Sequence, residues 1–163
     1  MVAISDVDPR AFNREVAREL KERKISQPPV WAAFAKTGSH RERPPASPDW
    51  WHHRAAAVLR VVAVKGPIGT AKLVVRFGGR KNRGVKPDQY REAGGNNIRK
   101  CLQQLEKGGL IKQVERAGHK GRALTKAGAE FLNGAASRTR KAGAVKPHAH
   151  KEETVEVEAE VEA

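Results

Sequence analysis

The apolar residues of the chain recur mostly at every third or fourth position, the spacing that places them on one face of an α-helix. Such a stripe occurs in residues 8–24 and again in residues 96–107, the amphipathic helix, whose opposite face carries cations and amides. Residues 50–64, the central helix, are apolar on nearly every face, which is typical of a helix enclosed by other elements. These segments predict a mostly helical fold.

Capping residues mark the ends of the helices. Asp8 precedes a proline and is suited to begin the first helix, because its carboxylate can accept hydrogen bonds from free backbone N–H groups. Gly66 is expected to end the central helix. Asn96 or Asn97 is expected to cap the amphipathic helix, and Thr125 to cap a final helix.

The segments between the helices show different patterns. Residues 39–48 are polar and rich in proline, and residues 78–95, the basic segment, are rich in glycine and cations without a period, so both are expected to be loops. Residues 110–116 predict a strand. A turn at 118–121 and a short return strand at 122–124 would complete a β-hairpin.

The order of these elements predicts the fold class. A central helix, a short helix at 70–76, an amphipathic helix and a two-stranded hairpin follow one another as in the winged-helix variant of the helix-turn-helix. We therefore expect a mostly α, winged-helix-like domain with a small β-hairpin wing over residues 1–137. Residues 138–163 are expected to be a disordered tail, first basic and then acidic.

The charge of the chain indicates which kind of partner it binds. The net charge is +14, but the last twelve residues hold six Glu and no Lys or Arg, so the preceding 151 residues carry +20. Such a density of like charge favours a polyanionic partner. We expect no membrane partner, because the chain has neither a long apolar run nor a signal-type segment. A cytoplasmic location follows as the expectation.

The length of the basic segment distinguishes between two nucleic acids. A helix-turn-helix usually joins its helices by a short turn, whereas the whole basic segment separates the helix at 70–76 from the amphipathic helix. A long basic insertion suits a folded RNA surface, which is recognised by shape and phosphate position. RNA is therefore preferred, and the alternative is a winged-helix DNA-binding transcriptional regulator.

The candidate RNA-binding residues are cations of the central helix, the short helix, the basic segment and the amphipathic helix: Arg54, Arg60, Arg76, Arg80, Lys81, Arg83, Lys86, Arg91, Arg99 and Lys100. Arg54 and Arg60 lie about 120° apart on an ideal helix, so they do not easily share one phosphate. For these two, a structural role at the edge of a buried helix, paired with a carboxylate such as Asp49, is an equal alternative.

Other cations could also be an ordinary solvated helix face, although their clustering next to the basic segment favours RNA contact. Trp50 is expected in the core and Trp51 at its boundary. Neither is expected to stack on bases, because aromatic residues make up only 5% of the chain.

The sequence gives no sign of catalytic, cofactor or metal chemistry. His52 and His53 are adjacent and point apart on a helix, while His148 and His150 lie in the expected tail without a cysteine pair. Cys101 falls in an apolar stripe and is expected to be inert core. No nucleophile stands beside a base, and the glycine-rich turn after the central helix lacks the P-loop order. We expect a non-enzyme without cofactor or small-molecule substrate.

One run of residues resembles a known family. Residues 36–50, KTGSHRERPPASPDW, match the K-x-x-x-H-(K/R)-E-x-x-P-x-x-x-x-W stretch of the archaeal and eukaryotic small-subunit ribosomal protein nineteen, the e-type family. Further matches, which together span about residues 5–136, are Pro29-x-Trp31, Arg54-Ala55-Ala56 with Arg60, Gly78-Gly79-Arg80 with Gly84-Val85-x-Pro87, Leu102-Gln103-x-Leu105-Glu106 and Leu124-Thr125-x-x-Gly128.

This resemblance implies a structural constituent of the small ribosomal subunit. It implies a winged-helix-like fold on ribosomal RNA in the head of that subunit, next to other head proteins, and a part in subunit assembly and rRNA maturation. The acidic tail from Glu152 is not part of the family core, so the resemblance implies nothing about it.

Overall fold

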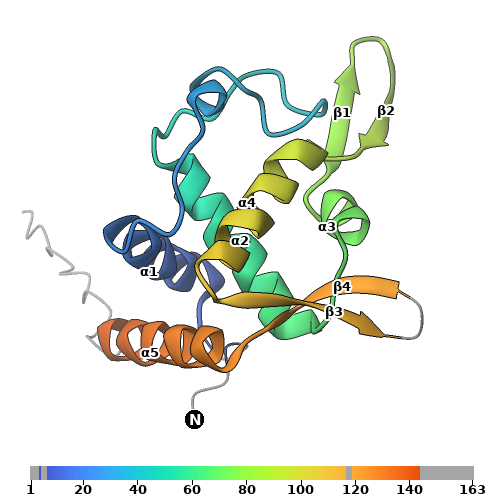
Figure 1. Ribbon diagram of the computed structural model, residues 1–163. Helices are drawn as coiled ribbons and strands as arrows, with labels where there is room; N and C mark the ends of the chain where they lie inside the picture. Colours follow the sequence, from blue (N-terminus) through green and yellow to red (C-terminus); the bar gives the residue numbers. More distant parts are fainter. Residues whose placement is uncertain (1–3, 5–6, 117–118, 144–163) are drawn as a thin grey trace, which may run out of the picture.

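The computed structural model describes residue 4 and residues 7–116 and 119–143, and within these ranges the fold is mostly helical with two antiparallel hairpins (Figure 1). The elements in chain order are α1 (Pro9–Glu22), the 3₁₀ helix η2 (Val30–Ala33), α2 (Trp50–Lys65), α3 (Thr70–Arg76), β1 (Gly79–Arg83), β2 (Lys86–Arg91), α4 (Gly95–Lys107), β3 (Ile111–Arg116), β4 (His119–Leu124) and α5 (Lys126–Gly143). The predicted winged-helix-like fold class is confirmed.

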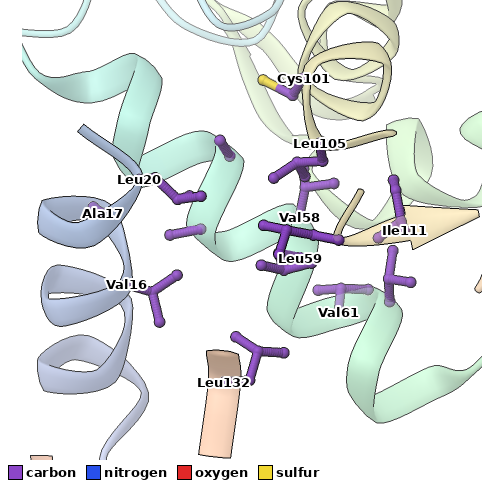
Figure 2. Close-up of a cluster of buried hydrophobic side chains, with 14 of the residues drawn as sticks. Val16, Ala17, Leu20, Val58, Leu59, Val61, Cys101, Leu105, Ile111 and Leu132 are labelled. Atoms are coloured by element: carbon purple, nitrogen blue, oxygen red, sulfur yellow. The ribbon is translucent and has the colours of Figure 1, made fainter. Parts of the chain in front are cut away.

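Helix α2 is the centre of the core. It packs against α1, α4 and strand β4. Figure 2 shows side chains of α1, α2, α4, β3 and α5 converging in one cluster that contains Leu20, Leu59, Leu105, Ile111 and Leu132. The near-continuous apolar surface of α2 is what allows so many elements to pack on it at once.

Most of the predicted helix ends are confirmed. The Asp8 carboxylate accepts hydrogen bonds from the backbone N–H groups of Arg10 at 3.3 Å and Ala11 at 3.0 Å. The Thr125 hydroxyl accepts one from the Gly128 N–H at 3.0 Å. Gly66 ends α2 with a φ of 72°, a conformation that side chains disfavour.

The predicted asparagine cap of α4 is wrong. The helix begins at Gly95, and its capping position is Gly94, which offers no side chain. Asn97 lies inside the first turn, is buried, and donates from Nδ2 to the carbonyl oxygen of Lys36 at 3.4 Å. This residue therefore ties α4 to the loop before α2 and does not cap its own helix.

The basic segment is not the loop that its sequence suggested, because β1 and β2 form a hairpin within it. Gly79 pairs with Arg91, and the turn is closed by the Asn82 side chain, which accepts from the Gly84 N–H at 2.8 Å. Strand β2 is exposed along its whole length. A ribbon that buries neither face has no apolar alternation, so the pattern gave no strand signal.

The turn of the wing formed by β3 and β4 was predicted at residues 118–121, which is too far along the chain. Arg116 pairs with His119, so the return strand begins at His119, and the connecting residues 117–118 lie outside the described residues. Ile68 extends this sheet through two backbone hydrogen bonds with Arg122, of 3.1 and 3.0 Å. The wing is thereby fixed to the connection between α2 and α3.

The predicted places of the two adjacent tryptophans are reversed. Trp51 is 0% exposed, and its Nε1 donates to Gln104 Oε1 at 2.8 Å. Trp50 is half-buried and meets Trp51 edge-on, with ring centroids 5.3 Å apart. One residue turns a helix by about 100°, so neighbours of equal hydrophobicity face different surroundings that only the packing selects.

Helix α5 continues beyond Ser137, the last residue of the expected domain, to Gly143. Arg138, placed in the tail by sequence, forms ion pairs with Glu15 at 3.3 Å and with Glu19. Glu19 is only 7% exposed, so this pairing compensates a buried carboxylate. The expected acidic tail, with His148 and His150, lies outside the described residues. Of the helices described, none has the length and apolar composition to span a bilayer.

We predict that truncating the core of α2 strongly destabilises the protein. Leu59→Ala should lower the free energy of unfolding by about 2–5 kcal/mol, because Leu59 is 0% exposed and a cavity would remain. Val64→Ala on the same helix, at a side chain 54% exposed, should change it by no more than about 0.5 kcal/mol. Urea unfolding followed by circular dichroism measures both, and equal effects would contradict the central role of α2.

Candidate nucleic-acid interface

The β1–β2 hairpin carries half of the ten cations predicted from the sequence to bind RNA. It stands out from the helical body in Figure 1. Its candidate residues are Arg80, Lys81, Arg83, Lys86 and Arg91, all exposed except the half-buried Lys81. Within the described residues only Arg80 has a carboxylate partner, Asp88, at 3.3 Å. The other cations therefore remain available to an external anion.

Contacts at its base hold the hairpin in place. The Tyr90 hydroxyl donates to the carbonyl oxygen of Val75 in α3. A side chain at Gly78 would collide with the Tyr90 ring, so a residue larger than glycine would not fit there. Just after β2, the Ala93 N–H donates to the Val74 carbonyl at 3.2 Å. The hairpin is thus attached to the end of α3.

Three cations lie within electrostatic range of His40, which packs against the start of β1. Burial lowers the pKa of His40, and the positive charges of Arg41, Arg54 and Lys81 lower the pKa further. These three come from the loop before α2, from α2 and from β1. The structure therefore brings together two predicted site residues, Arg54 and Lys81, with Arg41. Sequence analysis missed Arg41, although it lies in the run that resembled the ribosomal family.

Arg54 is held by an aromatic ring and not by a carboxylate. Its guanidinium carbon lies 4.7 Å from the centroid of the Phe77 ring. Burial, together with the charge of Arg41, lowers the Arg54 pKa. The expected alternative partner, Asp49, instead binds Lys21 at 2.8 Å. No carboxylate of the described residues forms an ion pair with Arg54, so its N–H edge is free to bind an anion.

Arg60 is not brought into this group. It is half-buried, and its Nε is hidden from solvent without a hydrogen-bond partner in the described part of the chain. Six residues along a helix separate it from Arg54 by about 9 Å and about 120°. The two arginines therefore serve separate positions, as their spacing predicted.

The outer face of α4 offers a second basic surface. Arg99, Lys100 and Lys107 are exposed on it. Gln104, one of the amide residues of this helix, faces inward: its Oε1 accepts from Trp51 Nε1, and its Nε2 donates to the Gln27 carbonyl. It therefore supports the core and is not available to a partner.

Arg76, at the end of α3, lies on a third basic patch. With Lys65 and Lys72 it lines a hollow of about 520 Å³. The ten candidate residues thus fall into the hairpin with the His40 group, the α4 face, this patch, and Arg60 by itself.

The chemistry of this surface is that of anion binding. Cys101 is buried against α2, and burial raises the pKa of its thiol to about 12, so the reactive thiolate is suppressed. In the described ranges, no three His, Cys, Asp or Glu residues are close enough together to hold a metal ion. Guanidinium and ammonium groups without carboxylate partners are suited to phosphate.

Comparison with known proteins identifies the family. The sequence model described as ribosomal protein S19e matches residues 3–142. The chain belongs to the ribosomal protein S19e family. Its relatives include the small ribosomal subunit protein eS19 of Aeropyrum pernix, 45% identical over 135 residues, which are 82% of this chain and 86% of that protein. The eS19 of Dictyostelium discoideum is 38% identical over 133 residues, 81% and 88% of the two chains, and that of Haloarcula marismortui is 38% identical over 137 residues, 82% and 88%.

Membership in the S19e family confirms the resemblance found at residues 36–50. A ribosomal protein of this family is a structural component, so the expectation of a non-enzyme is confirmed. The comparisons give no support to a DNA-binding regulator.

We predict that the free energy of unfolding falls as the pH falls below 6.5, the ordinary pKa of His. Below this pH His40 is protonated in the unfolded chain, whereas its lowered pKa keeps it neutral in the folded protein, so protonation favours unfolding. His52, whose pKa burial also lowers, acts in the same direction. The free energy of unfolding should be higher at about pH 7.5 than at about pH 5.5. His40→Gln should make this difference smaller, and an unchanged difference would mean that His40 titrates normally.

Proposed function

We propose that this protein is a structural constituent of the small ribosomal subunit and that it binds ribosomal RNA through the β1–β2 hairpin and the cations around His40. One observation carries the proposal: apart from Arg80, the cations of a fixed hairpin lack carboxylate partners among the described residues and lie near Arg41 and Arg54, in a member of a ribosomal protein family. The named relatives are small ribosomal subunit proteins.

Charge supports RNA as the partner. The like charges of the hairpin repel one another, and a polyanion removes this repulsion. The hairpin is inserted between α3 and α4, where a helix-turn-helix has only a short turn. An exposed cationic ribbon instead suits recognition of phosphate positions on a folded RNA.

The remaining candidates extend the proposed interface. Arg99 and Lys100 on α4 and Arg76 on α3 would contact further phosphates, and Arg60 would contribute from α2. The family resemblance supports a position in the head of the subunit beside other head proteins, and a role in subunit assembly and rRNA maturation. We propose a cytoplasmic location in the assembled subunit.

Sedimentation tests the function directly. The protein should co-migrate with purified small subunits at moderate salt, about 0.1–0.2 M, and should dissociate steeply as salt rises, because each neutralised phosphate releases counterions. Immunoblotting of gradient fractions measures both effects. Absence of the protein from the small-subunit fractions would overturn the proposal.

Charge reversal tests the hairpin. Changing Arg83, Lys86 and Arg91 together to Glu should lower incorporation into small subunits at least about tenfold, because three exposed cations would be replaced by repulsive charges. The matched control reverses Arg10, Arg14 and Arg140, which are exposed on α1 and α5 and form no ion pair within the described part of the chain. Equal losses in both triple variants would show that only total charge matters.

A further inference from the structure

A hollow of about 450 Å³ lies between the loop that precedes α2 and the first turns of α2. Arg41, Arg43 and Arg54 line it on the polar side, and Trp50, Pro44 and Pro45 provide an apolar wall. Its volume lies within the range of pockets that take small organic ligands, about 300–1,000 Å³. The site therefore has the dimensions of a nucleotide and both kinds of surface that a nucleotide presents.

The polar side of the hollow is lined by cations without a carboxylate beside them. None of its lining residues is Asp or Glu. The Phe77 ring holds the Arg54 guanidinium, and Arg41 and Arg43 are exposed and form no ion pair with any described residue. The carboxylate of Asp49, next to Trp50 in the chain, already accepts hydrogen bonds from Lys21 Nζ. The three guanidinium groups are thus free to donate to phosphate oxygens.

The apolar wall is held rigidly from behind. Trp50 packs edge-on against Trp51, with an interplanar angle of 78°. Trp51 is itself fixed by the 2.8 Å hydrogen bond to Gln104 of α4. A flat ring that is already positioned gives a base a stacking surface with little loss of entropy.

Backbone contacts also fix the rim of the hollow. The Gly94 N–H, at the start of α4, donates to the Thr37 carbonyl at 2.9 Å, and Gly38 forms a bridge with Ala93. The Arg41 N–H donates to the Gly38 carbonyl at 3.1 Å. The loop that lines the hollow is therefore anchored to the residues that follow the hairpin.

We propose that this hollow receives one unpaired RNA nucleotide, with its base against Trp50 and the two prolines and its phosphate held by Arg43 and Arg54. The inference rests on the proposed function and deepens it: the hairpin contacts the backbone, and the hollow selects a nucleotide that is extruded from a helix. Trp50 thereby gains a binding role that the low aromatic content of the chain argued against.

The test uses the purified full-length protein and two RNA hairpins that differ only by one bulged adenosine. The bulged hairpin should bind about tenfold more tightly, because stacking of one base contributes about 1–3 kcal/mol. Ultraviolet cross-linking with mass spectrometry should place the adenosine on the peptide that contains Trp50. Arg43→Ala, at an exposed loop position, and Trp50→Leu should each abolish the preference for the bulge. Arg14→Ala, an exposed arginine of α1, should retain it.

The outcomes separate this proposal from the proposed function. Equal affinity for the two hairpins, without a cross-link at Trp50, would overturn the pocket and leave the ribosomal role intact. Failure to bind either hairpin would count against both. Adenosine monophosphate alone serves as a third probe, and if it bound as tightly as the bulged hairpin, the hollow would be a site for free nucleotides and not for RNA. Circular dichroism of each variant confirms folding.

Discussion

The burial of α2 is the constraint on which the rest of the structure depends. Its apolar surface must be covered on nearly every side, and α1, α4 and β4 pack on it from different directions. Because covering this helix removes much apolar area from water, the arrangement of the neighbours follows from it. The polar bonds between Trp51, Gln104 and the Gln27 carbonyl then fix how α4 sits relative to α2.

Helix α2 contributes residues both to the core and to the candidate interface. At its first turns, Trp51 points into the core, while Trp50 and Arg54 reach the surface hollow. Arg54 rests on Phe77 at the end of α3, directly before the β1–β2 hairpin. The cations of the interface are therefore placed by rigid, well-packed elements, which is the arrangement that gives a binding surface a defined shape.

The interface concentrates positive charge without internal compensation. Carboxylates elsewhere in the protein already form ion pairs: Glu19 pairs with Arg138, and Asp49 pairs with Lys21. Around His40, Arg41, Arg54 and Lys81 have no such partners among the described residues. Burial lowers the His40 pKa, and the charges of these three cations lower it further. The free protein thus tolerates local repulsion in a region whose physical complement is the phosphate backbone of RNA.

Local sequence determined the helices, their caps at Asp8 and Thr125, the family and the basic character of the hairpin, because periodicity, capping and composition act over a few residues. Tertiary structure decided the rest. Which of Trp50 and Trp51 is buried, whether Asn97 caps a helix or binds a distant carbonyl, and where Arg54 finds a partner all depend on neighbours far away in the chain. The hairpin escaped detection because its strands are paired by backbone hydrogen bonds, which leave no mark on a pattern of side chains that face water on both sides.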